Sequence, residues 1–307
     1  MRALRLSLLL LTLSAATVAA QTRSIAERLG YPAGSKLLIL HADDLGVAHS
    51  ENVASFDALD RGAVSSASVM IPTPWVSEVA AYFRAHPNVD LGLHLTLTSE
   101  WETYRWGSVE SREKVPSLLD STGTFPNDES IVAKRAKPAE VDRELRAQVE
   151  RALALGIHPT HIDSHMGSLF TTPELVAVYV KVAHDYHLPF LALKGSGFGA
   201  PGAGLSPQDV VLDAVIIADR QVPNDQWKAW YLTQIDSLKP GITEIIVHLG
   251  HDDAELQAVT VNHDAYGSAW RQRDYDVVTS PEFAKALKDH NVIVVKWKDL
   301  YRAAQMK

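Results

Sequence analysis

The sequence predicts an α/β protein built as a (β/α) barrel, either complete or distorted. Three observations support this fold class. Short apolar segments alternate with amphipathic segments along most of the chain, which is typical of parallel strands joined by helical crossovers. About eight segments have strand character, which suits a barrel better than an open sheet. Histidines and aspartates gather where several of these segments end.

Residues 1–20 have the pattern of a secretory signal peptide. Arg2 and Arg5 supply positive charge, an apolar run follows, and small residues at 18–20 offer a cleavage site. The apolar run is too short to span a bilayer. We therefore expect export to a bacterial periplasm or beyond, with residues 21–307 forming a single domain and no membrane span remaining after cleavage.

The first strand is predicted at residues 37–40, where consecutive apolar residues are typical of a strand buried on both faces. It leads directly into His41, Asp43 and Asp44. Two adjacent carboxylates repel each other and are costly to bury unpaired, so we expect a positive group beside them. A metal ion held by an aspartate meets this requirement. Alternatively, one aspartate caps the next helix.

Strands and helices alternate after this point. Further strands are predicted at residues 65–71, 89–98, 159–163, 189–193, 213–218, 243–248 and 292–297. Helices are predicted at residues 50–59, 74–86, 138–155, 172–184, 223–237 and 281–290. Ser50 is a candidate N-cap for the first helix. Residues 100–127 interrupt the alternation as a long loop, and loops of this length in compact domains are usually functional or disordered.

The composition narrows the range of partners. The formal net charge is -8, and removal of the signal peptide with its two arginines makes it -10. This balance argues against nucleic acid or an anionic membrane surface as a partner. The chain has no cysteine, so a bound metal needs histidine and carboxylate ligands. The oligomeric state is not indicated by the sequence.

Polar side chains with metal-binding or acid–base chemistry lie at or just beyond the ends of predicted strands. They are Asp43, Asp44, His94, His161, Asp163, His165 and His248. In a parallel barrel such side chains converge on one rim. Two imidazoles and one carboxylate leave positions on a metal open for water and substrate, while a second carboxylate and a further histidine can act as general base and acid. Singly, each histidine could also be a core or loop residue.

Four segments together resemble the YdjC family of carbohydrate deacetylases, which includes chitooligosaccharide deacetylase. They are residues 41–46 (HADDLG), 92–98 (GLHLTLT), 116–125 (with PSLL and GTF) and 159–165 (PTHIDSH). The resemblance extends over nearly all of the chain after the signal peptide. It implies a barrel related to the polysaccharide deacetylases, a divalent metal ion, and removal of an N-acetyl group from an amino sugar.

The resemblance also implies roles for individual residues. Asp44, His94 and His165 are the expected metal ligands, and Asp43 is the expected general base. His248 is expected to protonate the departing amine. Mixed nitrogen and oxygen ligands suit one divalent ion, with Mg²⁺ or Zn²⁺ expected first and Mn, Co or Ni as alternatives.

Further residues are expected to contact a carbohydrate substrate. His161 and Asp163 are expected to orient the metal ligands or the bound substrate. Trp101, Tyr104 and Trp106 in the long loop are candidates for stacking on sugar faces, or alternatively for simple packing of the loop.

Two features depart from the family pattern. Residues 166–170 read Met-Gly-Ser-Leu-Phe, where family members commonly carry a run of histidines. The signal peptide is the second departure, because the chitooligosaccharide enzymes act on imported cytoplasmic sugars. An exported relative would meet periplasmic glycans, peptidoglycan fragments or extracellular polysaccharide. Arg271 and Arg273 are expected to pair with surface carboxylates, or alternatively with an anionic group of the substrate.

Two other functions remain as alternatives. A centre of one aspartate and two histidines does not itself select the bond, so a hydrolase of phosphoesters or of non-sugar amides is one of them. The absence of a basic cluster near the motifs counts against phosphate. The other is a catalytically silent glycan-binding protein that keeps the metal. Asp43 discriminates between them, because a binding protein has no need for the second carboxylate.

Overall fold

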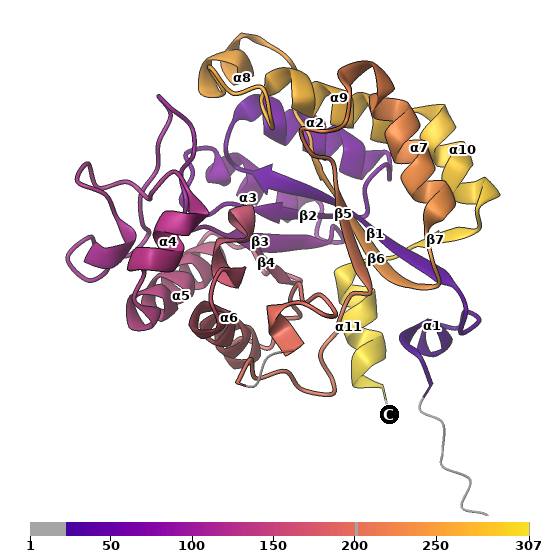
Figure 1. Cartoon of the computed structure of the whole chain (residues 1–307), viewed down its shortest axis with the longest axis horizontal. Helices are drawn as coiled ribbons and strands as arrows, with labels where there is room; N and C mark the ends of the chain where they lie inside the picture. Colours follow the sequence, from indigo (N-terminus) through magenta and orange to yellow (C-terminus); the bar gives the residue numbers. More distant parts are fainter. Residues whose placement is uncertain (1–22, 200–201, 307) are drawn as a thin grey trace, which may run out of the picture.

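The computed structural model describes residues 23–199 and 202–306, so the predicted signal peptide lies outside the described residues. Strands and helices alternate around one parallel sheet (Figure 1). The strands are β1 (Lys36–Leu45), β2 (Ser66–Val69), β3 (Leu91–Leu95), β4 (Ile162–Ser164), β5 (Ala214–Ile217), β6 (Gly241–His248) and β7 (Val292–Val294). The α/β class expected from the alternating pattern is therefore confirmed.

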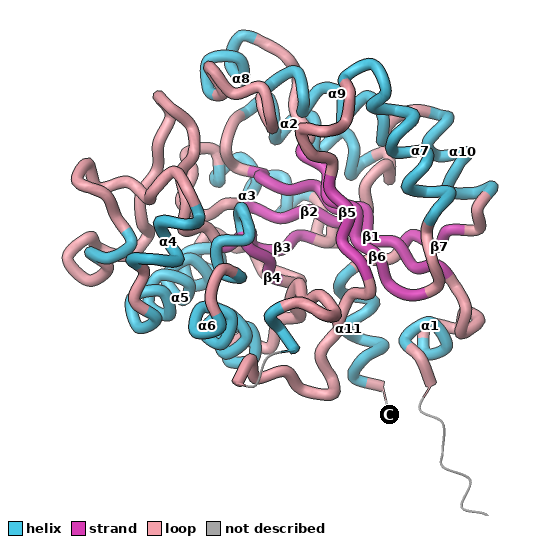
Figure 2. The backbone as a smooth tube through the Cα atoms, in the orientation of Figure 1, coloured by secondary structure: helices cyan, strands magenta, loops and turns pink. Residues whose placement is uncertain are grey.

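The sheet is organised around β1. Its strands pair in the order β4-β3-β2-β1-β6-β5, and every pairing is parallel (Figure 2). On one side, β6 follows β1 over residues 36–43. The other side of β1 is shared, because β7 pairs with residues 36–38 and β2 pairs beyond them over residues 41–45.

The outer strands β4 and β5 are linked through residues 189–193. Isolated parallel bridges join Ile162 to Phe190 and Leu193 to Leu212, just before β5. The sheet thereby closes into a distorted barrel, as predicted. The full strand predicted for 189–193 was wrong, because this segment makes only these two bridges to its neighbours.

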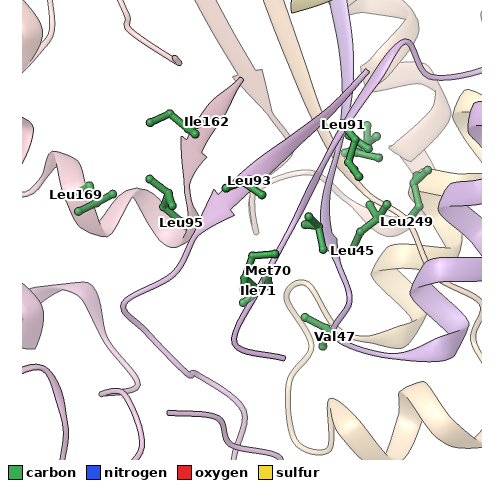
Figure 3. Close-up of a cluster of buried hydrophobic side chains, with 14 of the residues drawn as sticks. Leu45, Val47, Met70, Ile71, Leu91, Leu93, Leu95, Ile162, Leu169 and Leu249 are labelled. Atoms are coloured by element: carbon green, nitrogen blue, oxygen red, sulfur yellow. The ribbon is translucent and has the colours of Figure 1, made fainter. Parts of the chain in front are cut away.

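Successive side chains of β3 point alternately toward the apolar core and toward the interior of the barrel. Leu91, Leu93 and Leu95 are buried in the main apolar cluster, which lies between the sheet and the helices (Figure 3). Each buried leucine contributes about 1.5–3 kcal/mol relative to an exposed one. Gly92 and His94 occupy the alternate positions and face the interior of the barrel.

The helices form the outer layer. Helices α3, α2, α9, α7 and α10 pack in that order, and α5 packs against α6 at the left of Figure 1. Their bounds are α1 (Ile25–Arg28), α2 (His49–Asp60), α3 (Val76–Ala85), α4 (Glu129–Arg135), α5 (Pro138–Ala154), α6 (Pro173–Asp185), α7 (Trp227–Ser237), α8 (Ala254–Val259), α9 (Ser268–Val278), α10 (Pro281–Asp289) and α11 (Trp297–Gln305). Short 3₁₀ helices are η1 (Pro116–Leu118), η2 (His165–Phe170), η3 (Gly197–Gly199) and η4 (Asn224–Gln226). Among the described helices, none has the length and apolar character needed to cross a membrane.

The predicted N-cap of the first long helix was wrong. Helix α2 begins at His49 after Ala48, whose side chain makes no capping bond. The hydroxyl of Ser50 instead donates to Asp253 at 2.7 Å, which ties α2 to the segment that leads into α8. Competition from this tertiary bond explains why the local capping pattern failed.

The strand predicted at residues 292–297 is also shorter than expected, because Trp297 begins α11. The backbone N–H of Trp297 donates to Asp90 at 2.8 Å, and its indole N–H donates to Glu244 at 3.0 Å. The indole stacks on His161 with ring centroids 5.5 Å apart. The first turn of α11 therefore closes the amino end of the barrel.

The absence of a side chain at Gly92 leaves room for the His161 ring that stacks on Trp297. Substitution of Gly92 therefore tests this packing. A Cβ atom at Gly92 would lie 2.4 Å from Nε2 of His161, whose ring is buried against Trp297 and cannot move aside. We expect Gly92→Ala to lower the free energy of unfolding by about 1–3 kcal/mol in urea denaturation. Gly34→Ala is the matched control, because no atom lies within 4 Å of the position that its Cβ would take, and its effect should stay within about 0.5 kcal/mol. Equal losses would contradict the close packing.

Candidate metal centre

The end of β1 brings two neighbouring carboxylates to the same rim. Its pairing with β2 shifts register between Ala42 and Leu45, and Asp44 has a φ of 70°. Neighbouring residues of a regular strand point to opposite faces, so this irregularity lets Asp43 and Asp44 both face the site. A left-handed conformation at a non-glycine residue costs about 1–3 kcal/mol and is concentrated at functional sites. Neither aspartate caps α2, which has Ala48 as its N-cap, so the capping alternative was wrong.

Asp44, His94 and His165 come together as the resemblance implied. Oδ1 of Asp44 lies 3.3 Å from Nε2 of His94 and 3.2 Å from Nδ1 of His165. All three side chains are buried, and Oδ1 of Asp44 has no hydrogen-bond partner among the described residues. Donor atoms at this spacing fit around one divalent ion with bonds of about 2.0–2.2 Å. The three residues therefore fit a metal ion.

The second ring nitrogen of each histidine faces a carboxylate. Nδ1 of His94 lies 2.6 Å from Oδ1 of Asp163, and Nε2 of His165 lies 2.9 Å from Oε2 of Glu100. Such bonds fix the orientation of a ligand imidazole and select its tautomer. Asp163 therefore lies where it can orient a metal ligand, while Glu100 is a site residue that the sequence did not single out.

Arg271 holds the other oxygen of Asp44. Its Nη2 atom lies 2.8 Å from Oδ2 of Asp44, and its Nη1 atom lies 3.1 Å from Oε1 of Glu51. Burial raises the pKa of Asp44, but the Arg271 guanidinium together with His165 and His94 outweighs this effect and holds that pKa well below its usual range. The predicted pairing with surface carboxylates was wrong, because α9 carries Arg271 into the interior. Arg273 lies over the ring of Trp227 at 4.8 Å.

Asp43 is anchored through one oxygen only. Its Oδ1 atom lies 3.1 Å from Nε2 of His41 and accepts a hydrogen bond from Ser68 at 3.3 Å. Its Oδ2 atom faces Nε2 of His94 at 3.7 Å and Nε2 of His248 at 4.0 Å. Residues 43 and 248 are also register partners on β1 and β6, which explains why His248 reaches the same rim.

The pKa values of the two ligand histidines show that the carboxylates around the centre favour positive charge. Burial lowers the pKa of His165, but Glu100 and Asp44 outweigh it and raise that pKa to about 9. The pKa of His94 is raised well above its usual value, because Asp43 and Asp163 outweigh the opposing effect of burial. His248 differs, since burial dominates there and lowers its pKa to about 4. The carboxylates thus create a site for cations around the two ligand histidines.

His41 was noted in the sequence before Asp43 and Asp44, but no role in the site was predicted for it. It is fully buried, and its Nε2 atom lies 3.1 Å from both Asp43 and Asp163. Burial lowers the pKa of His41, but hydrogen bonds to Asp163 and Asp43 outweigh it and raise the pKa to about 10. Its position in the sequence could have indicated a role, because a residue two positions before Asp43 lies on the same face of the strand.

His161 lies away from the ligands, at the closed end of the barrel. Its ring is fully buried, stacks on Trp297 and lies 5.1 Å from the ring of His41. Burial lowers its pKa to about 4. The predicted contact between His161 and substrate is not supported, because other side chains enclose its ring.

The aromatic loop residues pack inside the protein. Trp101 is 1% exposed and Trp106 is 4% exposed. The Arg271 guanidinium covers the Trp101 ring at 5.6 Å, and the Tyr104 hydroxyl donates to the carbonyl of Val47 at 2.6 Å. These contacts match the loop-packing alternative, and Trp101, which borders the cavity, is almost fully covered.

A cavity of about 970 Å³ opens over the centre. It is lined by Asp43, Asp44, His94, His165 and His248, together with loop residues and apolar side chains. Small-molecule sites commonly occupy about 300–1,000 Å³, so this cavity has room for more than a single small group.

Comparisons with known proteins agree with this geometry. The profile of the YdjC-like protein family matches residues 37–289. A carbohydrate deacetylase of Thermus thermophilus is 32% identical over 286 residues, which cover 90% of this chain and 98% of the relative. One from Thermoanaerobacter pseudethanolicus is 25% identical, with 86% and 99% covered. A crystal structure from Enterococcus faecalis V583, provisionally named for cellobiose-phosphate cleavage, matches with a TM-score of 0.72 and 25% identity, over 87% of this chain and 99% of that one.

The buried pair of Arg271 and Glu51 yields a stability test. The carboxyl of Glu51 is buried, its two oxygens accept no hydrogen bond among the described residues, and Arg271 is its ion-pair partner, so removing the guanidinium leaves this buried polar group without a partner. We expect Arg271→Met to lower the free energy of unfolding of the metal-free protein by about 3–5 kcal/mol. Adding Glu51→Gln should restore part of that loss.

Arg273→Met is the matched control for this variant. Arg273 lies on the same helix over the Trp227 ring and forms no ion pair with the described residues, so we expect a loss of at most about 1 kcal/mol. Urea denaturation in the presence of a chelator measures all of these variants. An Arg271→Met protein as stable as Arg273→Met would contradict the importance of the buried ion pairs.

Proposed function

This chain belongs to the YdjC-like protein family, and we propose that it is a metal-dependent hydrolase that removes N-acetyl groups from amino sugars or their oligosaccharides. The relatives named carbohydrate deacetylase support the substrate class. The observation that carries the proposal is the position of Asp43. It stands beside a complete ligand set but keeps one oxygen free, which suits a general base.

Asp44, His94 and His165 would hold the ion. When bound, a divalent ion polarises the amide carbonyl and activates water for attack. We propose Mg²⁺ or Zn²⁺ first, with Mn, Co or Ni as alternatives, because one carboxylate and two imidazoles suit each of them.

Asp43 is the proposed general base. His41 and Ser68 hold its Oδ1 atom, so Oδ2 keeps a fixed direction toward the ligand set. Asp43 takes a proton from the attacking water through this free oxygen. Positioned general bases typically contribute about 10²–10⁴-fold to a rate.

His248 is the proposed proton donor to the departing amine. Burial lowers its pKa to about 4 in the free protein, so this role requires that it gain a proton during the reaction, for which Asp43 is the neighbouring source. The Nε2 atom of His248 lies 4.0 Å from Oδ2 of Asp43, and its strand β6 lies on the other side of β1 from β3. The carbon–nitrogen bond of the amide breaks while the proton reaches nitrogen. The products are acetate and a free amine.

We also propose that the protein is exported. Support comes from the charge, apolar run and small residues of the first 20 positions. N-terminal sequencing of protein recovered from the periplasm or medium of the native bacterium should begin at Gln21. Recovery from the cytoplasm with an intact Met1 would contradict export.

The activity is tested by acetate release from a panel of N-acetylated oligosaccharides and peptidoglycan fragments. A chelator should abolish release, and added divalent metal should restore it, because the ligands bind a removable ion. Asp43→Asn should lower kcat by at least about 100-fold while elemental analysis still finds one ion per chain. Asp252→Asn is the matched control, since Asp252 is exposed, and should leave kcat unchanged.

Each failure of this experiment has a separate meaning. If Asp43→Asn had the kcat of the wild-type protein, Asp43 would not be the general base. Binding of glycans without any acetate release, both before and after Asp43→Asn, would identify a glycan-binding protein instead of an enzyme.

A further inference from the structure

The interior of the barrel is polar on one side and aliphatic on the other. Strands β1 to β4 direct the proposed metal ligands, Asp43 and the residues that anchor them into it. The opposite wall consists of aliphatic side chains that line the same cavity: Leu191, Leu193, Val215, Ile217 and Ile246. The apolar wall is therefore continuous with the proposed catalytic site.

Strand register places this wall directly beside the catalytic residues. Ile217 of β5 pairs with Ile246 of β6, and Ile246 lies two positions before His248. Residues two apart in a strand share a face, so Ile246 and His248 both point into the interior. Ile217 is 39% exposed although it lies on a strand, because it faces the cavity.

Two apolar residues that follow His165 extend this surface, one of them aromatic. Met166 and Phe170 both line the cavity, and Met166 is 39% exposed. Met166 has a φ of 51°, which marks a sharp turn of the chain immediately after the ligand. Flexible methionine side chains adapt well to apolar ligands of varied shape.

Ser196 and Arg220, which follow the wall residues Leu193 and Ile217 in the chain, also line the cavity. Five other polar residues of the lining lie on loops or at the start of α4, and they are exposed or half-buried, as expected at the mouth: Glu102, Arg105, Asn127, Glu129 and Asn262. These side chains suit sugar hydroxyls, which need hydrogen-bond partners when they leave water. The sugar therefore belongs at the mouth, and the aliphatic interior is left for another part of the substrate.

We propose that the interior wall binds the acyl chain of the amide, and that this chain is longer than acetyl. The inference rests on the proposed function and extends it from N-acetyl groups to longer aliphatic N-acyl groups on the amino sugar. An amide joins the sugar to the acyl group, so a sugar at the mouth directs the acyl chain inward past Ile246 and Ile217. The cavity of about 970 Å³ has room for such a chain.

The reaction is the same hydrolysis with a longer acid as product. The amide carbon–nitrogen bond breaks, and the oxygen of water forms a bond to the carbonyl carbon. The proton that Asp43 takes from water is balanced by the proton that His248 gives to nitrogen. The second hydrogen of water stays on the acid and then passes to the amine, so a fatty carboxylate and the ammonium form of the amino sugar leave. The proton on Asp43 passes to His248, so that both side chains regain their starting states.

The test compares kcat/KM of the metal-loaded protein on glucosamine with N-acetyl, N-butanoyl, N-hexanoyl and N-octanoyl groups. We expect a rise of about threefold to fourfold for each added methylene until the wall is covered, because each methylene leaves water for an apolar surface. The octyl glycoside of N-acetylglucosamine carries its chain on the sugar instead. We expect it to gain less than the N-octanoyl compound.

Ile217→Glu tests the wall itself. A carboxylate among the aliphatic side chains should lower the N-octanoyl to N-acetyl ratio of kcat/KM by at least about tenfold, since it opposes burial of the chain. Val294→Glu is the matched control, because Val294 is 42% exposed and lies outside this cavity, and the ratio should not change. Calorimetry should also detect octanoate binding more tightly than acetate to the wild-type protein, and less tightly to Ile217→Glu.

The outcomes separate this inference from the function on which it rests. Hydrolysis of N-acetyl compounds with no gain from longer acyl chains overturns the inference alone. A greater gain from the octyl glycoside than from N-octanoyl places the chain on the sugar and also overturns it. No hydrolysis of any compound, with octanoate and acetate bound equally, overturns both.

Discussion

Two adjacent carboxylates can share one rim of a barrel only if the strand bends between them and positive charge meets each of them. The left-handed backbone at Asp44 supplies the bend. The charges come from opposite directions, because Arg271 holds Oδ2 of Asp44 and His41 holds Oδ1 of Asp43. Each carboxylate therefore has one anchored oxygen and one free oxygen. The free oxygen of Asp44 faces His94 and His165, the proposed metal ligands, and the free oxygen of Asp43 is the one proposed to act as general base.

The regular and the irregular parts of the barrel wall lie on opposite sides of the cavity. Strand β1 pairs with three neighbours and carries the two aspartates, so the polar centre rests on the most extensively paired part of the sheet. Residues 189–193, which complete the wall on the far side, contribute only isolated bridges. The cavity lies between these two regions. A regular barrel would fill that space with layers of interior side chains.

Much of this arrangement could be predicted from local patterns. The strand ending in Asp43 and Asp44 was evident from its apolar run, and His94 and His165 followed from their positions at later strand ends. The stretch at 189–193 looked equally strand-like, but pairing with distant segments decides whether such a run becomes a strand. Arg271 gave no local signal, since a charged residue is normally exposed and only the tertiary placement of α9 buries it. The role of His41 was not predictable for a similar reason. An apolar strand does not show which carboxylates its interior side chains will contact.

The two bridges at 189–193 also bear on how relatives of this protein can diverge. Substitutions, insertions or deletions in that segment disturb little of the hydrogen-bonded ladder, whereas the same changes in β1 would shift the aspartates. Natural variation can therefore reshape one wall of the cavity while the centre stays fixed. Proteins that share every acidic and imidazole group of this centre can accordingly evolve to accept different molecules, and the centre alone does not identify the substrate of each.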